Sequence, residues 1–294
     1  MIDGRIIKAL SGFFYVETED ENIYQCRGRG VFRNKKISPL VGDYVRFDKS
    51  NPNEGYIMEV KERENELIRP PVANIDQAII VSSATEPDLN TILLDRFLVL
   101  IESKDIQPVI FITKMDTVSD GAIEKINNYK KDYQQMGYEV ELLSSKEPSQ
   151  LPDLGRYFTN NVTVIAGQSG VGKSSLLNAL NPSLLLKTAE ISKSLGRGKH
   201  TTRHVELVRV HSGYVADTPG FSSLDFSEIE LEDLTDCFPE FRERKEDCKF
   251  RGCMHNKEPK CAIKQAVDKG EIASYRYEHY LSFYEEIQTR KPRY

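Results

Sequence analysis

Hydrophobic and polar positions alternate in short runs through the first 70 residues. Gly, Pro, Asn and acidic residues separate these runs, which lie at residues 12–16, 22–26, 43–47 and 55–60. Alternation with a period of two predicts strands with one buried face. About five short strands in a region of this length suit a small closed barrel, most commonly an OB-fold. Because Arg69-Pro70-Pro71 ends the pattern, we place the first domain at residues 1–70.

From residue 72 onward, apolar runs alternate with amphipathic stretches. The apolar runs predict strands at 77–82, 108–113, 138–143, 162–166, 205–210 and 214–216. The amphipathic stretches predict helices at 93–103 and 123–136. Such alternation is typical of an α/β fold in which helices cover a parallel sheet, here at residues 71–226. Residues 227–294 are charged and predict a mostly helical third domain.

The composition fits a cytoplasmic globular protein. The formal net charge of −5 argues against binding nucleic acid over the whole surface. No apolar run approaches the roughly 18 residues of a membrane span, and the first residues do not open a signal peptide. We therefore expect a cytoplasmic protein without a membrane partner.

A glycine-rich loop stands between a predicted strand and a predicted helix. It reads Gly167-Gln168-Ser169-Gly170-Val171-Gly172-Lys173-Ser174-Ser175. Such a loop turns its backbone N–H groups toward phosphates at the helix N-terminus. We expect Lys173 between the β- and γ-phosphates and the Ser174 hydroxyl on Mg²⁺. Because a strand and a helix flank the loop, a chance glycine-rich turn is a poor alternative.

Two further motifs follow this loop. Asp217-Thr218-Pro219-Gly220 ends a predicted strand, where Asp217 can reach Mg²⁺ through water and the Gly220 amide can meet the γ-phosphate. Between the two motifs, either Thr201 or Thr202 would complete the Mg²⁺ shell. The three segments therefore predict the phosphate and magnesium site of a GTPase.

The residue that orients the attacking water is not obvious from these motifs. Phe221 stands where Ras-type enzymes carry a glutamine, and a phenyl ring cannot orient water. Hydrolysis should therefore be slow, or another group must position the water. His200 is the nearest candidate in the sequence, although a solvated loop histidine is an equal alternative.

The motif that would read the guanine base precedes the phosphate loop, whereas it follows the loop in Ras-like chains. In Thr113-Lys114-Met115-Asp116, the Asp116 carboxylate can accept both N1–H and N2–H₂ of guanine. Lys114 would pack along the base, and Thr113 replaces the more usual Asn. Ser144-Ser145-Lys146 would offer a backbone N–H to guanine O6. This order predicts a circularly permuted GTPase that binds GTP and GDP.

Four candidate metal ligands lie close together in the last domain. They are Cys248, Cys253, His255 and Cys261. Three thiolates and an imidazole fill a tetrahedral site, so they predict one structural Zn²⁺ with no open position for catalysis. A redox-active pair or buried free thiols remain alternatives.

Basic residues gather in two regions. One lies in the predicted barrel, at Arg27, Arg29, Arg33, Lys35 and Lys36. The other surrounds the cysteines, at Arg242, Arg244, Lys245, Lys249, Arg251, Lys257 and Lys260. Each region alone would suit a solvated face. Beside an OB-like barrel, however, they favour contact with RNA.

These motifs together resemble the RsgA family (also called YjeQ or YloQ) over essentially the whole chain. The resemblance rests on Thr-Lys-x-Asp, the phosphate loop, Gly-Arg-Gly-x-His-Thr-Thr, Asp-Thr-Pro-Gly-Phe and the Cys₃His cluster. It implies an OB-fold, a permuted GTPase core and a zinc domain, in that order. It also implies that His200 positions the water.

The resemblance further implies a checkpoint factor for the small (30S) ribosomal subunit. Such a factor binds 16S rRNA near the decoding centre, and the subunit stimulates its GTPase. Hydrolysis accompanies its release and that of another assembly factor, and guanine alarmones can compete for the site. We expect the chain to act as a monomer.

Two other functions fit parts of the sequence. An RNA-binding scaffold would use GTP only to set its affinity, and an ATP-dependent phosphate-loop enzyme would not depend on Asp116 for nucleotide choice. The permutation leads Asp217–Phe221, which we call the second switch motif, directly into the last domain. We therefore expect a shift of this motif to reposition residues 230–294 relative to the barrel.

Overall fold

The computed structural model describes residues 1–28, 32, 37–144, 154–180, 205–217 and 224–290, without the side chains of 179, 180 and 217. The chain divides into two compact units. The first comprises residues 1–79, 146–168 and 172–222, and the second comprises residues 80–145, 169–171 and 223–294. Among the described helices, none is long and apolar enough to span a membrane.

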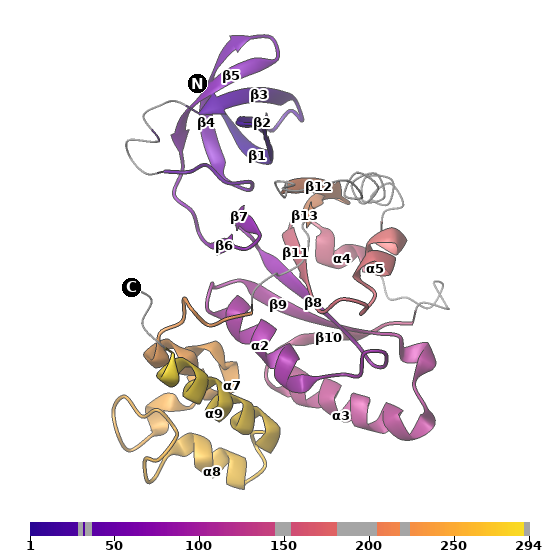
Figure 1. Cartoon of the computed structure of the whole chain (residues 1–294), viewed down its shortest axis with the longest axis vertical. Helices are drawn as coiled ribbons and strands as arrows, with labels where there is room; N and C mark the ends of the chain where they lie inside the picture. Colours follow the sequence, from indigo (N-terminus) through magenta and orange to yellow (C-terminus); the bar gives the residue numbers. More distant parts are fainter. Residues whose placement is uncertain (29–31, 33–36, 145–153, 181–204, 218–223, 291–294) are drawn as a thin grey trace. The chain divides into compact units, whose positions relative to one another are not determined.

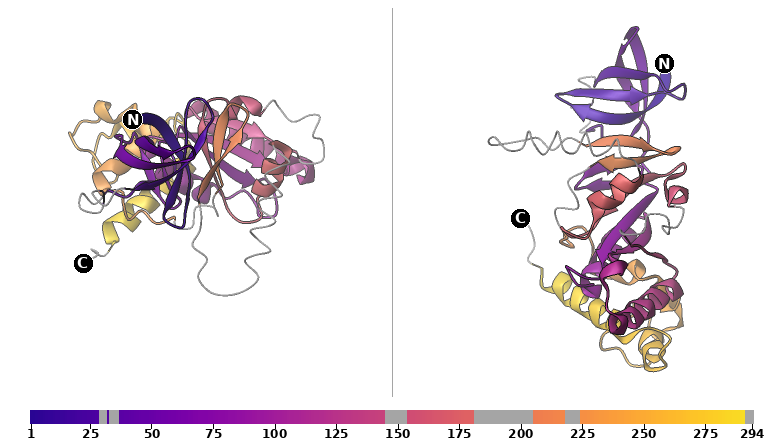
Figure 2. Two further views of the ribbon diagram at one scale, coloured as in Figure 1. Left: turned by 90° about the horizontal axis from the view of Figure 1, so that it is seen from above. Right: turned by 90° about the vertical axis from the view of Figure 1, so that its right-hand side faces the viewer.

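The first unit begins with a closed five-stranded barrel (Figures 1 and 2). Its strands are β1 (Ile2–Leu10), β2 (Phe13–Glu17), β3 (Ile23–Gly28), β4 (Tyr44–Asn51) and β5 (Glu54–Val60). They pair in the order β1-β2-β3-β5-β4, and β4 closes the barrel against β1. Alternate residues such as Val45, Phe47 and Ile57 are fully buried. The predicted N-terminal barrel is therefore confirmed.

The first unit continues with the strand that leads into the phosphate loop and with two strands that follow the loop in the sequence. They are β11 (Val162–Ala166), β12 (Glu206–Val210) and β13 (Gly213–Asp217), accompanied by α4 (Gly155–Phe158) and α5 (Lys173–Leu180). β11 and β13 run parallel, whereas β12 is antiparallel to β13. A short hairpin of β6 (Glu66–Ile68) and β7 (Pro71–Ala73) follows the barrel.

The barrel contacts these strands through β12. Lys8 of β1 pairs in register with Glu206 of β12, and their side chains form an ion pair of 2.9 Å. Glu17 of β2 accepts hydrogen bonds from Arg209, at 3.1 Å, and from the Tyr214 hydroxyl. Polar contacts thus link the barrel to the strands beside the phosphate loop.

The second unit contains the strands that lead to the base-binding motif. β9 (Gln107–Thr113) and β10 (Glu139–Leu142) run parallel, and most of β8 (Gln77–Ser83) belongs to the same unit. α2 (Thr91–Glu102) packs on β9 and α3 (Asp120–Gln135) packs on β10 (Figure 1). Residues 109–112 of β9 are buried throughout, because parallel strands covered by helices expose neither face.

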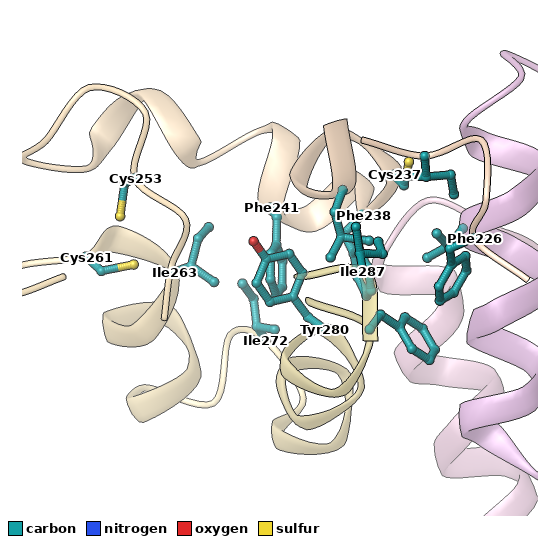
Figure 3. Packing of buried hydrophobic residues seen from close by; sticks show 14 of the residues in the cluster. Phe226, Cys237, Phe238, Phe241, Cys253, Cys261, Ile263, Ile272, Tyr280 and Ile287 are labelled. Atoms are coloured by element: carbon teal, nitrogen blue, oxygen red, sulfur yellow. The ribbon is translucent and has the colours of Figure 1, made fainter. Parts of the chain in front are cut away.

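The second unit also holds the helices of the C-terminal module, which we define as residues 231–289. Its elements are η3 (Leu231–Cys237), α7 (Pro239–Arg242), η4 (Lys245–Asp247), α8 (Ala262–Asp268) and α9 (Ser274–Thr289), the last in yellow in Figure 2. Phe238, Phe241 and Tyr280 (Figure 3) form its buried core together with Phe283. This core also includes Val99, so the module packs on α2.

Candidate functional site

The glycine-rich loop joins β11 to α5, as the sequence predicts. Gly167, Gly170 and Gly172 have φ values of +138°, +84° and +97°, which other residues adopt only with strain. Lys173 is the first residue of α5, and its Nζ donates to the carbonyl oxygens of Gly167 and Gln168, each at 2.7 Å. Burial lowers the pKa of Lys173. The ammonium is therefore folded back over the loop, where an anion would favour its charged form.

The base-binding motif follows β9, and the structure brings two of its predicted segments together. Asp116 lies in η1 (Met115–Thr117), and its Oδ1 accepts a hydrogen bond of 3.1 Å from Ser144 Oγ. Lys114 has a φ of +60°, and its ammonium donates to the carbonyl of Glu86. A carboxylate already oriented by a hydroxyl is suited to bind the N–H groups of guanine.

Thr113 has a role that the sequence did not reveal. Its Oγ1 lies 2.6 Å from the carbonyl oxygen of Val171 in the phosphate loop and 3.2 Å from that of Ser82. Since a hydroxyl has one proton, the shorter contact is the stronger hydrogen bond. The hydroxyl therefore ties the start of the base-binding motif to the phosphate loop.

Several predicted site residues lie outside the described residues. These are Ser145, Lys146, His200, Thr201, Thr202 and Gly220, together with the side chain of Asp217 at the end of β13. Ser174 and Ser175 are exposed at the start of α5. The predictions for these positions stay predictions.

The four candidate metal ligands converge in the C-terminal module. The ligand atoms of Cys248, Cys253, His255 and Cys261 all lie within 4.8 Å of one another. His255 Nδ1 lies 3.6 Å from Cys248 Sγ and 3.3 Å from Cys261 Sγ, and the two sulfurs are 3.9 Å apart. The donor set that the sequence predicts is therefore assembled in three dimensions.

The three distances among Cys248, His255 and Cys261 fit the edges of a tetrahedral zinc site. Bonds of about 2.3 Å to sulfur and about 2.0–2.1 Å to nitrogen give edges of roughly 3.8 Å for S···S and roughly 3.6 Å for N···S. His255 is fully buried, and its Nδ1 faces the sulfurs. Burial raises the pKa of Cys253 to about 12, so a thiolate there requires a cation beside it.

The basic residues near the cluster are partly engaged in ion pairs. Lys245 contacts Asp236 at 2.5 Å, and Arg242 contacts Glu102 at 3.3 Å. Lys249 lies over the ring of Phe250, which is 43% exposed, with its Nζ 5.4 Å from the ring centroid. In the barrel, Arg27 lies 4.7 Å from the ring of Phe13, and the other four basic residues lie outside the described part of the chain. Arg242 and Lys245 therefore have intramolecular partners.

Two family models match consecutive parts of the chain. The model described as the RsgA N-terminal domain matches residues 3–57, and the model described as RsgA GTPase matches residues 60–227. The chain is 67% identical to the Small ribosomal subunit biogenesis GTPase RsgA 2 of Oceanobacillus iheyensis. It is 60% identical to the Small ribosomal subunit biogenesis GTPase RsgA of Bacillus subtilis. Each match covers 100% of both chains.

Two solved structures are similar over nearly the whole chain. One is YloQ, described as a circularly permuted GTPase, with a TM-score of 0.87 and 55% identity over 100% of this chain and 97% of that chain. The other is YjeQ from Thermotoga maritima, with a TM-score of 0.87 and 35% identity over 99% of each chain. The fold agrees with both, and the motif order agrees with the circular permutation described for YloQ.

Proposed function

Because the chain belongs to the RsgA GTPase family, we propose that it is a late checkpoint factor of the small (30S) ribosomal subunit whose GTPase the subunit stimulates. It is a circularly permuted GTPase that acts in small-subunit biogenesis. The observation that carries the proposal is the phosphate loop with Lys173 folded over it, in a chain whose base-binding motif comes first.

The nucleotide is held by two groups of residues in this proposal. Backbone N–H groups of residues 167–175 and the ammonium of Lys173 bind the phosphates, and Asp116 with residues 144–146 binds guanine. Ser174, Asp217 and either Thr201 or Thr202 hold Mg²⁺. The bond between Asp116 and Ser144 supports the second assignment.

The other partners follow from the two terminal regions. We assign one structural Zn²⁺ to the Cys₃His cluster, whose edges fit that metal. The barrel and the basic residues of the C-terminal module other than Arg242 and Lys245, which have intramolecular partners, bind 16S rRNA, and the chain acts as a monomer. Hydrolysis accompanies release of the protein and of another assembly factor.

His200 is expected to position the attacking water. Replacing His200 by alanine should lower the subunit-stimulated rate of GTP hydrolysis by about 100-fold, the usual size of such a contribution. Affinity for GTP should change little, because the side chain acts on water rather than on nucleotide. Single-turnover hydrolysis with purified small subunits measures the rate, and fluorescent-nucleotide titration measures the affinity.

A matched histidine provides the control for this experiment. His211 lies in the turn between β12 and β13 with a φ of +53°, so His211→Asn keeps the backbone conformation and should leave the rate unchanged. Wild-type turnover that small subunits do not raise would refute the proposed function. If His200→Ala abolishes turnover but release from the subunit proceeds as in the wild type, the RNA-binding scaffold is the better description.

Asp116 is expected to decide which base is bound. Asp116→Asn should weaken GTP binding by about 30-fold or more, because each hydrogen bond to a charged group contributes about 1.5–3 kcal/mol. Xanthosine triphosphate should gain affinity, since an amide N–H can donate to its additional carbonyl. Competition titrations with GTP, XTP and ATP measure this change. Asp120→Asn, an exposed position in the first turn of α3, is the control, and unchanged nucleotide choice in Asp116→Asn would favour an ATP-dependent enzyme.

A further inference from the structure

Arg96 of α2 contacts two distant parts of the chain at once. Its Nη1 donates to the backbone carbonyl of Leu224 at 3.0 Å and to Glu286 Oε1 at 2.9 Å, and its Nη2 donates to Glu286 Oε2. Leu224 is the first described residue after the second switch motif, and Glu286 lies in α9. One guanidinium thereby joins α2, this segment and the C-terminal module. We call residues 224–229 the exit segment.

Two aromatic rings hold the guanidinium in place. The Arg96 guanidinium carbon lies 4.5 Å from the ring centroid of Phe226 and 5.1 Å from that of Phe283. Phe226 is 3% exposed, and the two rings pack edge to face with centroids 5.0 Å apart. Stacking and a bidentate carboxylate fix the planar fork of an arginine, which a lysine cannot reproduce.

The rest of the exit segment is held from both sides as well. Arg290, which follows α9, donates to the carbonyl of Phe226 at 2.5 Å and to that of Ile229 at 3.2 Å. Lys104, which follows α2, forms an ion pair of 2.6 Å with Glu228. Arg290 and Lys104 each join the exit segment to one helix, α9 or α2, whereas Arg96 joins it to both helices at once.

The position of the exit segment in the sequence gives these contacts a functional meaning. Leu224 follows Gly220 by four positions, and Gly220 is the residue proposed to meet the γ-phosphate. We propose that Arg96 is the positioning residue that couples the second switch motif to the C-terminal module. In this inference, displacement of the motif reaches α9 through the carbonyl of Leu224, which Arg96 holds together with Glu286 of α9. This inference rests on the proposed function.

The test compares binding of the full-length protein to small ribosomal subunits in two nucleotide states. Dissociation constants are measured with a non-hydrolysable GTP analogue and with GDP, and their ratio reports the coupling between nucleotide and subunit. Arg96→Ala should bring this ratio closer to one by about 5-fold or more, which is the lower range of typical allosteric couplings. The KM for GTP should stay at the wild-type value while the subunit-stimulated kcat falls.

Arg242→Ala is the matched control. Arg242 also bridges the C-terminal module and α2, through Glu102 at 3.3 Å and the carbonyl of Asp236 at 3.1 Å, but these contacts do not involve the exit segment. The ratio of dissociation constants in Arg242→Ala should equal that of the wild type. Arg96→Lys keeps the charge without the fork and should give an intermediate ratio, which serves as the measurement if Arg96→Ala does not fold.

Three results would overturn the inference. The first is a ratio of dissociation constants in Arg96→Ala or Arg96→Lys that is unchanged from the wild type. The second is an equal fall of this ratio in Arg242→Ala, which would mean that loosening the module anywhere has the same effect. The third is a ratio of one in the wild-type protein itself, which would mean that the subunit is bound equally well in both nucleotide states. In that case the proposed nucleotide-dependent release fails as well, whereas the first two results leave the proposed function standing.

Discussion

Removing the zinc proposed for the Cys₃His cluster is expected to unfold the C-terminal module. Cys253 and Cys261 belong to the same buried core as Phe241, Ile263 and Tyr280, so the loops that carry the ligands are also walls of that core (Figure 3). Structural zinc contributes about 10–16 kcal/mol to the folding of small zinc modules. A whole domain is stable by only about 5–15 kcal/mol. The metal-free module should therefore lose its fixed tertiary structure.

Two measurements check this expectation. Elemental analysis should find one zinc per chain, and Cys261→Ser or chelation should abolish it. Near-ultraviolet circular dichroism should then lose the tyrosine signal of the module, since the chain has no tryptophan and Tyr277 and Tyr280 donate to the carbonyls of His255 and Met254 beside the ligands.

Cys237→Ser is the control for the zinc experiment. Cys237 is buried in the same core, but its thiol donates to the carbonyl of Asp233 at 3.4 Å and does not belong to the Cys₃His cluster. The Cys237→Ser protein should retain the metal and lose only about 1–2 kcal/mol of unfolding free energy, as expected for a small buried substitution. A wild-type protein that contains no zinc yet keeps its tyrosine signal would identify the cluster as buried free thiols, and full zinc content in Cys261→Ser would place the metal elsewhere.

The secondary structure was largely predictable because each element obeys one period. The alternation in β4 and β5 and the continuous apolar runs of β9 and β11 directly reflect burial of one face or of both faces. The short elements β6, β7 and α4 escaped prediction, since three or four residues carry no measurable period. The pairing of Lys8 with Glu206 also escaped, because register between distant strands depends on packing rather than on local pattern.

The placement of the glycine-rich loop and the grouping of the Cys₃His side chains were predictable because the residues of each are close together in sequence. The hydroxyl bond from Thr113 to Val171 was not, since the sequence shows only that an asparagine is replaced. Arg96 and Arg276 were missed for another reason. Their partners lie 128–190 and 36–181 positions away, and a charged residue on a helix ordinarily predicts a solvated face.

Arg276→Ala is expected to destabilise the protein strongly, although the Arg276 side chain binds neither metal nor nucleotide. Arg276 is fully buried, and its Nε and Nη2 donate to the two carboxylate oxygens of Glu240 at 2.8 and 3.2 Å. Its Nη1 lies 2.7 Å from Asp95 Oδ1 but outside hydrogen-bonding geometry, so this second contact is an ion pair. Burial alone would lower the pKa of Arg276, but the charges of Asp95 and Glu240 outweigh it and raise that pKa well above its usual value.

The remaining partners of Asp95 show why the loss should be large. Asp95 is fully buried in α2, where it accepts from the Tyr133 hydroxyl at 2.7 Å and lies 2.5 Å from His279 Nδ1. Without the guanidinium, the Asp95 and Glu240 carboxylates would stay buried without their cation. Breaking a buried ion pair from one side costs about 3–5 kcal/mol. Urea unfolding monitored by tyrosine ellipticity should show a loss of this size in Arg276→Ala.

Arg244→Ala separates the effect of burial from the loss of an arginine. Arg244 belongs to the same module, is 33% exposed, donates to the carbonyl of Glu240 at 3.0 Å and pairs with the exposed Glu243 at 3.6 Å, so its removal should cost only about 1 kcal/mol. Arg276→Lys keeps a charge but cannot bond both carboxylates in the same plane, and we expect an intermediate loss. A loss below about 1 kcal/mol in Arg276→Ala would mean that water or a rearranged side chain compensates the carboxylates. The buried network would then contribute little to holding the C-terminal module on α2.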